Sequence, residues 1–499
     1  MADKNVRPTA MAGKNARPTN NISRRGVIFV TALWVMLILG VLVLIFAREM
    51  RTEVIASQTR AGGEQVDAII EAGIQYALGV CDAYTSGNTV SNTPGDALSI
   101  CQSPSEAMQV GNAGYFWFIH SNPDDLQNYY YGITDESSKL YLNTATSEEL
   151  QLLPNMDVNS SDSIADWVDS DSTPHQNGAE SDYYSSLPRP YVAKNAGFES
   201  VEELLLVKGF AEDPIVGAQM LWGGDTNRNG VLDQGETAST TTGAQADFSC
   251  GLFPFVTCWA TQPDTDANGK ARTNVNPTQN TPTNPRQQQG PPQVNQQLIT
   301  ALQANPGPQL SQQRAQQIAQ AAAGQNFTSV FDFVQKTRMT DQEAKQSIDF
   351  LTTSTSKTLT GKININTVPL GVLQCLPNLQ AGDAQGIIAA RSNSADSVAG
   401  GSGMEWMFGQ VSAAVLSRVG PYITGHSYQY SADIVAVTAD GQSFRRVRVI
   451  IDCQKSPAKV IYRKEMTQYG WPLPKDIRDT LRNGTFQPGG TDSGVLWRP

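Results

Sequence analysis

The stretch VIFVTALWVMLILGVLVLIFA, residues 27–47, decides how this chain is organised. Its 21 residues are apolar or small and carry no charge. A helix of this length, at about 1.5 Å per residue, measures roughly 31 Å, close to the ~30 Å hydrocarbon thickness of a bilayer. The stretch is too long for the apolar core of a removable secretory signal, and no small-x-small cleavage site follows it. It therefore predicts a transmembrane helix.

The charges before this helix predict its orientation. Six basic residues and one acid precede it, so the N-terminal flank carries +5 and the rest of the chain −16 of the total of −11. Positive flanks stay in the cytoplasm. We expect a single-pass protein of a bacterial inner membrane, with a cytoplasmic N-terminus and the bulk of the chain in the periplasm. An acidic body also makes nucleic acid an unlikely ligand, because general attraction to a polyanion is missing.

The junction at Gly26 and Val27 resembles the cleavage site of type IV prepilins, in which a glycine follows a basic leader and precedes an apolar helix. The resemblance implies that a prepilin peptidase cuts after Gly26 and can methylate Val27. Most members carry glutamate at the fifth mature position, where this chain has Thr31. A carboxylate in hydrocarbon needs a partner, so its absence fits a subunit that joins a filament first. The alternative is a plain N-terminal anchor.

The sequence after the membrane segment predicts an α+β fold of the pilin-like kind. Apolar residues from Val66 to Leu78 recur at helical spacing, and Gly62-Gly63 is a possible break or kink. Aromatic runs at 115–119 and 129–134 predict strands, and the alternating runs 428–437 and 444–451 flank an Asp-Gly turn that predicts a hairpin. We expect a long N-terminal helix on an antiparallel sheet, with a large, mostly helical insert.

The insert contains a repeat. KLYLNTATSEELQLLP (139–154) and KININTVPLGVLQCLP (362–377) align without gaps and share seven positions, and a weaker third copy starts at Gly269. Each copy predicts a strand-like entry, an Asn or Thr cap and a short helix, followed by a second helix. The combination resembles helix-hairpin-helix or SAM-like modules. The DNA-binding form of such modules has glycines after Leu-Pro, whereas this chain has Asn155 and Asn378.

Cysteines and histidines give no catalytic pattern. The three histidines are far apart and lie beside no nucleophile motif, so we expect no enzyme activity. An even number of cysteines in an oxidising compartment favours disulfides. Proximity suggests Cys81 with Cys101 and Cys250 with Cys258, which leaves Cys375 with Cys453; fifteen pairings are possible, and buried thiols are the alternative.

Several strings in fixed order carry a closer resemblance. They are KLYLNT, IADWVDSD, GAESDYY, Pro190-Tyr191, Asn195-Ala196, SVEELLLVKG and GKININT. Together with the prepilin-like helix they resemble general secretion pathway protein K (GspK), the large minor pseudopilin of type II secretion systems. The resemblance implies a non-enzymatic subunit that caps a periplasmic filament, initiates its assembly and aids export of folded proteins. Implied partners are other minor pseudopilins, the major pseudopilin, the inner-membrane assembly platform, prepilin peptidase and membrane lipid.

Two segments are candidate calcium sites. In DTNRNGVLDQGE, oxygens at positions 1, 3, 5, 7, 9 and 12 follow EF-hand spacing, with Gly230 at the turn; they belong to Asp225, Asn227, Asn229, Val231, Asp233 and Glu236. The alternative is a polar turn. The second site is implied by the protein K family, which binds calcium in its helical domain; the matching acids are Asp166, Asp169, Asp171, Glu180 and Asp182. The alternative there is a set of helix caps and a solvated face.

The expected organisation has eight parts. They are a basic prepilin leader (1–26), a transmembrane helix (27–47), a pilin-like helix with first strands (48–138), a first helix-hairpin-helix unit (139–215), a calcium-loop and Gln/Pro-rich connection (216–308), a second helical unit (309–415), a C-terminal hairpin (416–465) and a tail (466–499). Two other functions stay open, namely a minor pilin of a type IV pilus or DNA-uptake machine, and a DNA-binding ectodomain.

Overall fold

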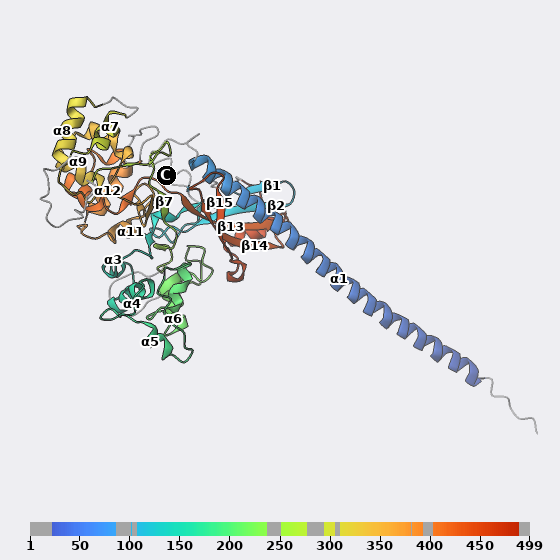
Figure 1. Ribbon diagram of the computed structural model, residues 1–499. Coiled ribbons are helices and arrows are strands. Elements are labelled where there is room, and N and C mark those ends of the chain that lie inside the picture. The colour runs from blue at the N-terminus through green and yellow to red at the C-terminus, as the bar shows by residue number, and fades with distance from the viewer. Residues whose placement is uncertain are drawn as a thin grey trace, which may run out of the picture. The chain divides into compact units, whose positions relative to one another are not determined.

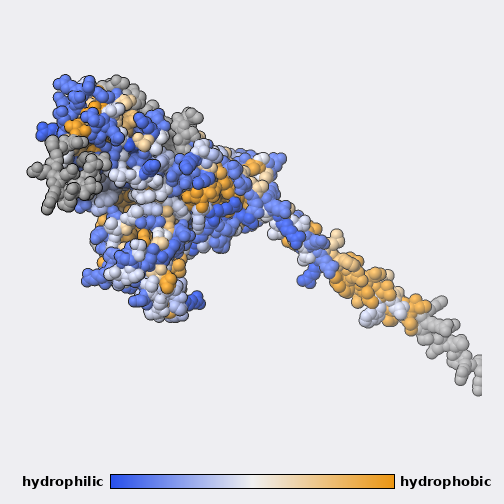
Figure 2. Space-filling view, in the orientation of Figure 1, coloured by the Kyte–Doolittle hydropathy of each residue, from blue (hydrophilic) through white to orange (hydrophobic). Residues whose placement is uncertain are grey.

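The computed structural model describes residues 22–85, 101, 107–236, 251–276, 294–304, 310–380, 382–392 and 403–488. The chain divides into two units, Met1–Gly62 and Gly63–Pro499. Helix α1 (Ile22–Thr85) belongs to both and continues through Gly62-Gly63, where the sequence allowed a break. Within the first unit, the side chains of residues 27–60 are exposed, and Figure 2 shows the apolar ones along this helix.

The second unit contains an antiparallel sheet with the order β1-β2-β13-β14-β15; β3 pairs with β2, and β4 pairs with β13 (Figure 1). The strands are β1 (Met108–Val110), β2 (Gly114–His120), β3 (Tyr130–Tyr131), β4 (Thr134–Asp135), β13 (Gln429–Thr438), β14 (Phe444–Asp452) and β15 (Lys459–Glu465). The predicted C-terminal hairpin is confirmed, since β13 pairs with β14 from Gln429 opposite Asp452 to Val437 opposite Phe444. All ten residues of β13 are buried, which makes it the centre of the sheet.

The part of α1 that follows Gly63 packs on one face of this sheet. Its buried residues recur with helical spacing and contact inward side chains of β2, β13 and β14 in one apolar core. Gly73 lets α1 lie close to β13, because a Cβ at this position would be 2.8 Å from the Ile434 side chain. The expected pilin-like arrangement of a long helix on an antiparallel sheet is thus present.

The opposite face is covered by a helix that the sequence analysis missed. The sequence analysis assigned residues 466–499 to a tail and predicted no helix there, but α14 (Lys475–Arg482) packs against Trp117 and Val437. Ile477 and Leu481 of this helix are buried, as is Leu473 just before it. The signal was an apolar residue at every fourth position from 473 to 481, and burying these side chains offsets the cost of ordering a short, highly charged helix.

The insert between β4 and β12 is mostly helical, and Figure 1 shows its longer helices in two groups. The first part contains α3 (Ser147–Gln151), α4 (Val158–Val168), α5 (Ser181–Ser185) and α6 (Pro214–Trp222). The second contains α7 (Gln296–Gln303), α8 (Gln312–Ala322), α9 (Val330–Lys336), α10 (Asp341–Ser347), α11 (Leu370–Gln374), α12 (Asp383–Ser392) and α13 (Ala413–Val419). Short 3-10 turns occur at Glu136–Ser138, Val201–Leu206, Ile348–Phe350, Glu405–Met407 and Thr467–Tyr469.

Helix α7 corrects one expectation. Residues 216–308 were expected to form a calcium loop and a Gln/Pro-rich connection, yet residues 296–303 form a helix. Asn295 caps it by accepting a hydrogen bond from Leu298 N at 3.2 Å, and Leu298, Ile299 and Leu302 are buried. Three apolar residues in a Gln-rich segment were enough to anchor one face of the helix.

Short strand pairs complete the insert. Three are parallel: β5 (Leu140–Tyr141) with β6 (Val256–Thr257), β8 (Thr273–Asn274) with β9 (Leu351–Thr352), and β11 (Ile363–Asn364) with β12 (Ile423–Thr424). The fourth pair, β7 (Thr261–Pro263) with β10 (Thr358–Thr360), is antiparallel. Each of the three sequence copies therefore begins in a strand that finds a parallel partner far along the chain.

Candidate functional site

The apolar stem is the first functional feature. Among the described residues, α1 is the one helix long and apolar enough to cross a membrane, with a mean hydropathy of 3.0 in its most apolar window. Gly26 and Val27, the expected cleavage position, both lie inside this helix. The Thr31 hydroxyl donates a hydrogen bond to the Ile28 carbonyl at 2.9 Å. Thr31 therefore satisfies its polar group within its own helix, as a residue in hydrocarbon must.

The acidic loop between α4 and α5 brings together three of its five predicted metal ligands. One carboxylate oxygen from each of Asp169, Asp171 and Glu180 lies within 4.8 Å of the others. Asp166 joins a neighbouring group with Asp169 and His175. Asp182, the fifth predicted ligand, is in neither group. Clustered carboxylates at this spacing are hard oxygen donors of the kind that calcium prefers.

Glu180 gives the strongest local sign that this loop could hold a cation. The residue is 6% exposed, and both of its carboxylate oxygens are buried without a hydrogen-bond partner. Burial raises the pKa of the Glu180 carboxyl, and the charges of Asp166 and Asp169 raise it further. A buried carboxylate in this state is costly unless a positive charge is close. A divalent cation would supply that charge.

Two residues of this loop were not identified as candidate ligands from the sequence. Asn195 adopts a positive φ of 47° and donates its amide to the Asp171 carbonyl, while its Oδ1 is buried without a hydrogen bond. His175 contacts Asp166 through Nδ1, and its backbone N–H donates to Asp166 Oδ1 at 3.0 Å. Asn195 Oδ1 is thus a further oxygen available to a cation. The only sequence signal for Asn195 was its place in the family string, and His175 was interpreted as a packing or surface residue.

The loop 225–236 is built differently. Gly230 N donates to Asp225 Oδ2 at 2.7 Å, and Asn229 N donates to Asp225 Oδ1 at 3.1 Å. Gly230 has a φ of 87°, and a Cβ there would lie 2.6 Å from Ser121. Burial raises the pKa of Asp225 to about 6, and the charge of Glu236 adds to the rise. The first half of the loop thus turns around Asp225.

Hydrogen bonds from within the molecule occupy the second half of this loop. Asp233 Oδ2 accepts from the side-chain amides of Asn227 and Asn229 at 2.8 and 3.1 Å, and Glu236 Oε1 accepts from Thr226 N at 2.9 Å. The acids of this loop are not among the described groups whose ligand atoms converge within 4.8 Å. A cation here would have to replace these hydrogen bonds, whereas in the acidic loop it meets oxygens that are already unsatisfied.

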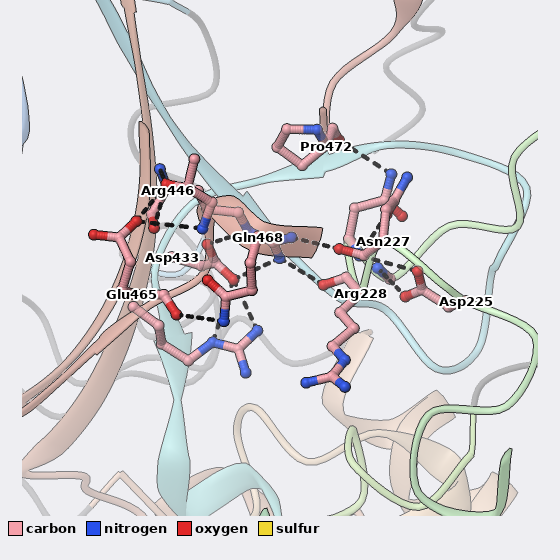
Figure 3. Close-up of polar contacts among 12 residues, drawn as sticks. Asp225, Asn227, Arg228, Asp433, Arg446, Glu465, Gln468 and Pro472 are labelled. Carbon is pink, nitrogen blue, oxygen red and sulfur yellow. Dashed lines mark hydrogen bonds and ion pairs between the residues drawn. The ribbon is translucent and has the colours of Figure 1, made fainter. Parts of the chain in front are cut away.

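Arg446 ties this loop to the sheet (Figure 3). Its guanidinium donates to the carbonyls of Asn227 and Arg228 at 2.6 and 2.5 Å, and to both oxygens of Asp433 at 2.8 Å. Arg446 is fully buried, and Arg448 donates to the same carboxylate at 2.7 Å. The arginines lower the pKa of Asp433 against the effect of burial. The position of the loop thus depends on a buried charge network whose hydrogen bonds compensate for desolvation.

Four of the described cysteines fall into two separate cores. Cys81 and Cys453 lie in the core between α1 and the sheet, whereas Cys258 and Cys375 lie in the core of the helical insert. The suggested pairing of Cys375 with Cys453 is therefore not one that the structure brings together, because sequence order gave no information on which core each residue joins. No disulfide joins the described cysteines. Cys250 lies outside the described residues, so its suggested pairing with Cys258 stays a prediction.

Comparisons with known proteins agree with the sequence resemblance. Residues 141–216 match the family model described as Type II secretion system (T2SS), protein K. A 50-residue stretch is 42% identical to the type II secretion system protein K of Pectobacterium carotovorum subsp. carotovorum; it is 10% of this chain and covers 15% of that relative's length.

A crystal structure of the GspK-GspI-GspJ complex from enterotoxigenic Escherichia coli contains a chain that aligns with 82% of this one and 98% of itself, at 9% identity and a TM-score of 0.40. The acidic loop lies inside the segment that the family model matches. The resemblance to protein K of the type II secretion system is therefore confirmed over residues 141–216, and this chain carries a domain of that family.

Proposed function

We propose that this chain is a minor pseudopilin at the tip of a type II secretion pseudopilus, where it initiates filament assembly and aids export of folded proteins across the outer membrane. The match of residues 141–216 to the protein K family is the observation that carries the proposal. The role is structural rather than enzymatic. The apolar stem of α1 would anchor the chain in the inner membrane, with the second unit in the periplasm.

The polar group of Thr31 supports the tip position. Its hydroxyl is satisfied by Ile28 of the same helix, so it requires nothing from a neighbouring subunit. A glutamate at this position would need a partner in hydrocarbon. A first subunit has no earlier neighbour, and a stem without that carboxylate suits the first place. The proposed partners are the other minor pseudopilins, the major pseudopilin, the assembly platform and prepilin peptidase.

Deleting the gene tests the secretion role against the alternatives. We expect exported enzymes to accumulate in the periplasm while DNA uptake and transformation continue unchanged. The opposite result would favour a minor pilin of an uptake machine. A gel-shift assay with the purified chain in detergent would reveal a DNA-binding ectodomain. Labelling of the chain along the shaft of the filament, rather than at its end, would contradict the tip position.

Mass spectrometry of the mature protein tests the processing step. We expect an N-terminus at Val27 in protein from wild-type cells and an intact leader in cells that lack prepilin peptidase. Replacing Gly26 by leucine should give the intact leader in both strains. An intact leader on the wild-type protein from normal cells would contradict the proposal that this chain is processed like a prepilin and then joins a filament.

The acidic loop is also proposed to hold a structural calcium ion, with Asp169, Asp171, Glu180 and Asn195 Oδ1 as ligands. The unsatisfied oxygens of Glu180 and Asn195 support this assignment. The loop 225–236 is proposed as a second, weaker calcium site, since its oxygens are already hydrogen-bonded. Metal at these sites would stabilise the folded chain through mass action.

Melting the full chain in detergent with calcium or with chelator tests both sites. We expect chelator to lower the melting temperature of the wild type and of Asp182→Asn, a matched control outside the converging group. Glu180→Gln should melt early and no longer respond to chelator. Asp225→Asn should lose a smaller part of the response. A chelator effect that persists unchanged in both Glu180→Gln and Asp225→Asn would show that calcium binds elsewhere.

A further inference from the structure

Two cysteines that lie far apart in the sequence meet in the core between α1 and the sheet. Cys81 lies near the end of α1, and Cys453 follows the last residue of β14. They are 0% and 2% exposed, and they belong to one apolar cluster. The Cys453 side chain is the first cause of a raised pKa at the Cys81 thiol, and burial adds to the rise. Two cysteines that share one core are candidates for a sulfur–sulfur bond, which needs their Cα atoms within about 7 Å of each other.

The backbone on both sides of this contact is held in place. Asp82, next to Cys81, accepts hydrogen bonds from the Ser456 hydroxyl and the Ala458 N–H, both at 3.2 Å. Cys453 N donates to the Tyr428 carbonyl at 2.8 Å, which fixes the end of β14 against the start of β13. The end of the helix and the chain after β14 are therefore in register without any help from the sulfurs.

The other described cysteines have different surroundings. Cys101 is buried, but it is not part of the apolar cluster that holds Cys81 and Cys453. Cys375 Sγ donates to the carbonyls of Leu152 and Gly371 at 3.3 and 3.2 Å, inside the helical insert. Cys81 and Cys453 are thus the pair that the geometry selects.

We propose that Cys81 and Cys453 form a disulfide bond that joins the helix of the second unit to the sheet. The proposal rests on the proposed periplasmic location, because disulfides persist in oxidising compartments. Two thiols lose two protons and two electrons as the sulfur–sulfur bond forms. The electrons reduce the disulfide of a thiol–disulfide oxidoreductase to a dithiol. Because both sulfurs are buried in the folded protein, the exchange takes place before α1 packs on the sheet.

The bond would close a loop that contains nearly the whole second unit. It would connect α1 to the last long strand pair and leave the chain between them inside one covalent ring. Cross-linking residues so far apart restricts the unfolded chain strongly. A helix that also anchors the protein in a membrane would then stay attached to the sheet when the local fold opens.

Peptide mapping of the wild-type chain tests the pairing directly. The protein is extracted from membranes in the presence of an alkylating agent and digested with trypsin and a protease that cleaves before aspartate. This digestion separates Cys81 from Cys101, which trypsin alone leaves on one peptide. We expect a linked peptide pair that contains Cys81 and Cys453 and disappears on reduction. Alkylation of both residues, or a link from either one to Cys101, would overturn the proposal.

Variants give an independent measurement. Reduction should lower the melting temperature of the wild type by about 5 °C or more. Cys81→Ser and Cys453→Ser should each show that lower temperature without reductant, and the double variant should be no less stable than either. Cys375→Ser is the matched control, a buried cysteine in the other core, and it should keep the response to reductant. Equal responses in all variants would contradict the bond.

Protease accessibility in spheroplasts separates this inference from the proposed function. If the second unit is outside the inner membrane but Cys81 and Cys453 are alkylated, the disulfide is wrong and the function stands. If the second unit is inside the cell, both the proposed function and the disulfide in the cell are overturned.

Discussion

The two copies of the repeat, residues 139–154 and 362–377, fold alike but are anchored differently. Each begins in a two-residue strand, continues into a five-residue helix and is followed directly by an asparagine with positive φ, 61° at Asn155 and 64° at Asn378. A longer helix follows each copy. The aligned leucines Leu150 and Leu373 are both fully buried.

The asparagine shared by the two copies, Asn143 in the first and Asn366 in the second, differs in burial and in hydrogen-bond partners. Asn143 is half-buried, and its side chain exchanges two hydrogen bonds with the backbone of Phe198, at 2.6 and 3.1 Å. Asn366 is 1% exposed; it donates to the carbonyls of Gly403 and Gly425 and accepts from Trp406 Nε1, at 2.9 to 3.0 Å. The side-chain amide connects the repeat to a later loop in both copies. The position thus preserves a bridging role, and the partner is chosen by the surrounding chain.

Among the variants that test this comparison, Asn366→Ala should lose the most unfolding free energy. It leaves a buried indole N–H and two buried carbonyls without partners, and each such group costs about 1–3 kcal/mol. We expect a loss of about 4 kcal/mol of unfolding free energy, measured by denaturant titration of the full chain in detergent. Asn159→Ala, an exposed asparagine, is the control and should change little. A loss of similar size in both variants would mean that Asn366 does not anchor its copy.

Acid should destabilise the second part of the helical insert, because it protonates Glu343 of α10, which pairs with Arg314 of α8. Arg314 Nε and Glu343 Oε1 are 2.8 Å apart, and Arg314 lowers the pKa of Glu343 to about 2. Because the folded pKa lies below the unfolded one, this stabilisation is complete above about pH 4.5 and is lost as the pH falls toward 2. The contribution is on the order of 2 kcal/mol.

The pH dependence of unfolding between 5 and 2.5 measures this contribution. Glu343→Gln should remove part of the slope, so that the difference in stability between this variant and the wild type becomes smaller from pH 5 to pH 2.5. Glu148→Gln, an exposed glutamate in the first copy, should leave the slope as it is. An unchanged slope in Glu343→Gln would assign the acid sensitivity to other carboxylates.

Asn143→Ala should cost less than Asn366→Ala. The variant leaves the N–H and carbonyl of Phe198 without a partner, but at a site that water can partly reach. We expect a loss of about 2 kcal/mol in the same denaturant titration. If Asn143→Ala and Asn366→Ala lose the same unfolding free energy, the difference in burial between these two residues has no energetic consequence.

Thr146→Ala should cause the smallest loss of stability. It tests whether the two copies differ at the start of their first helix. In the first copy Thr146 and Glu149 form a reciprocal capping box, whereas Pro369 begins the helix of the second copy without a side-chain cap. Loss of such a cap costs about 1 kcal/mol. Thr146→Ser should restore most of it. No loss in Thr146→Ala would make the two helix starts equivalent.

Much of the fold could be predicted because it depends on local patterns. The apolar stem, the hairpin of β13 and β14 and the two strand–helix copies all follow from periodicity and turn residues within short windows. Helices α7 and α14 were missed because their few apolar residues gain stability only from a core that forms elsewhere.

The candidate sites were predicted less completely. The acids of the acidic loop could be named from the family strings, but Asn195 reaches Asp171 only through the fold of the loop between them. The cysteine pairs required knowledge of which core each residue enters. Within the loop 225–236, Arg446 likewise bonds to backbone carbonyls, which leave no mark in the sequence.

The edge strand β15 determines how readily the sheets of neighbouring molecules can pair. It ends the sheet, its outward positions include Lys459, Arg463 and Glu465, and its pairing with β14 is irregular between Ile450 and Ile451. Charges and a bulge at a sheet margin discourage intermolecular strand addition. In the proposed filament, neighbouring subunits would therefore lie beside each other without joining their sheets.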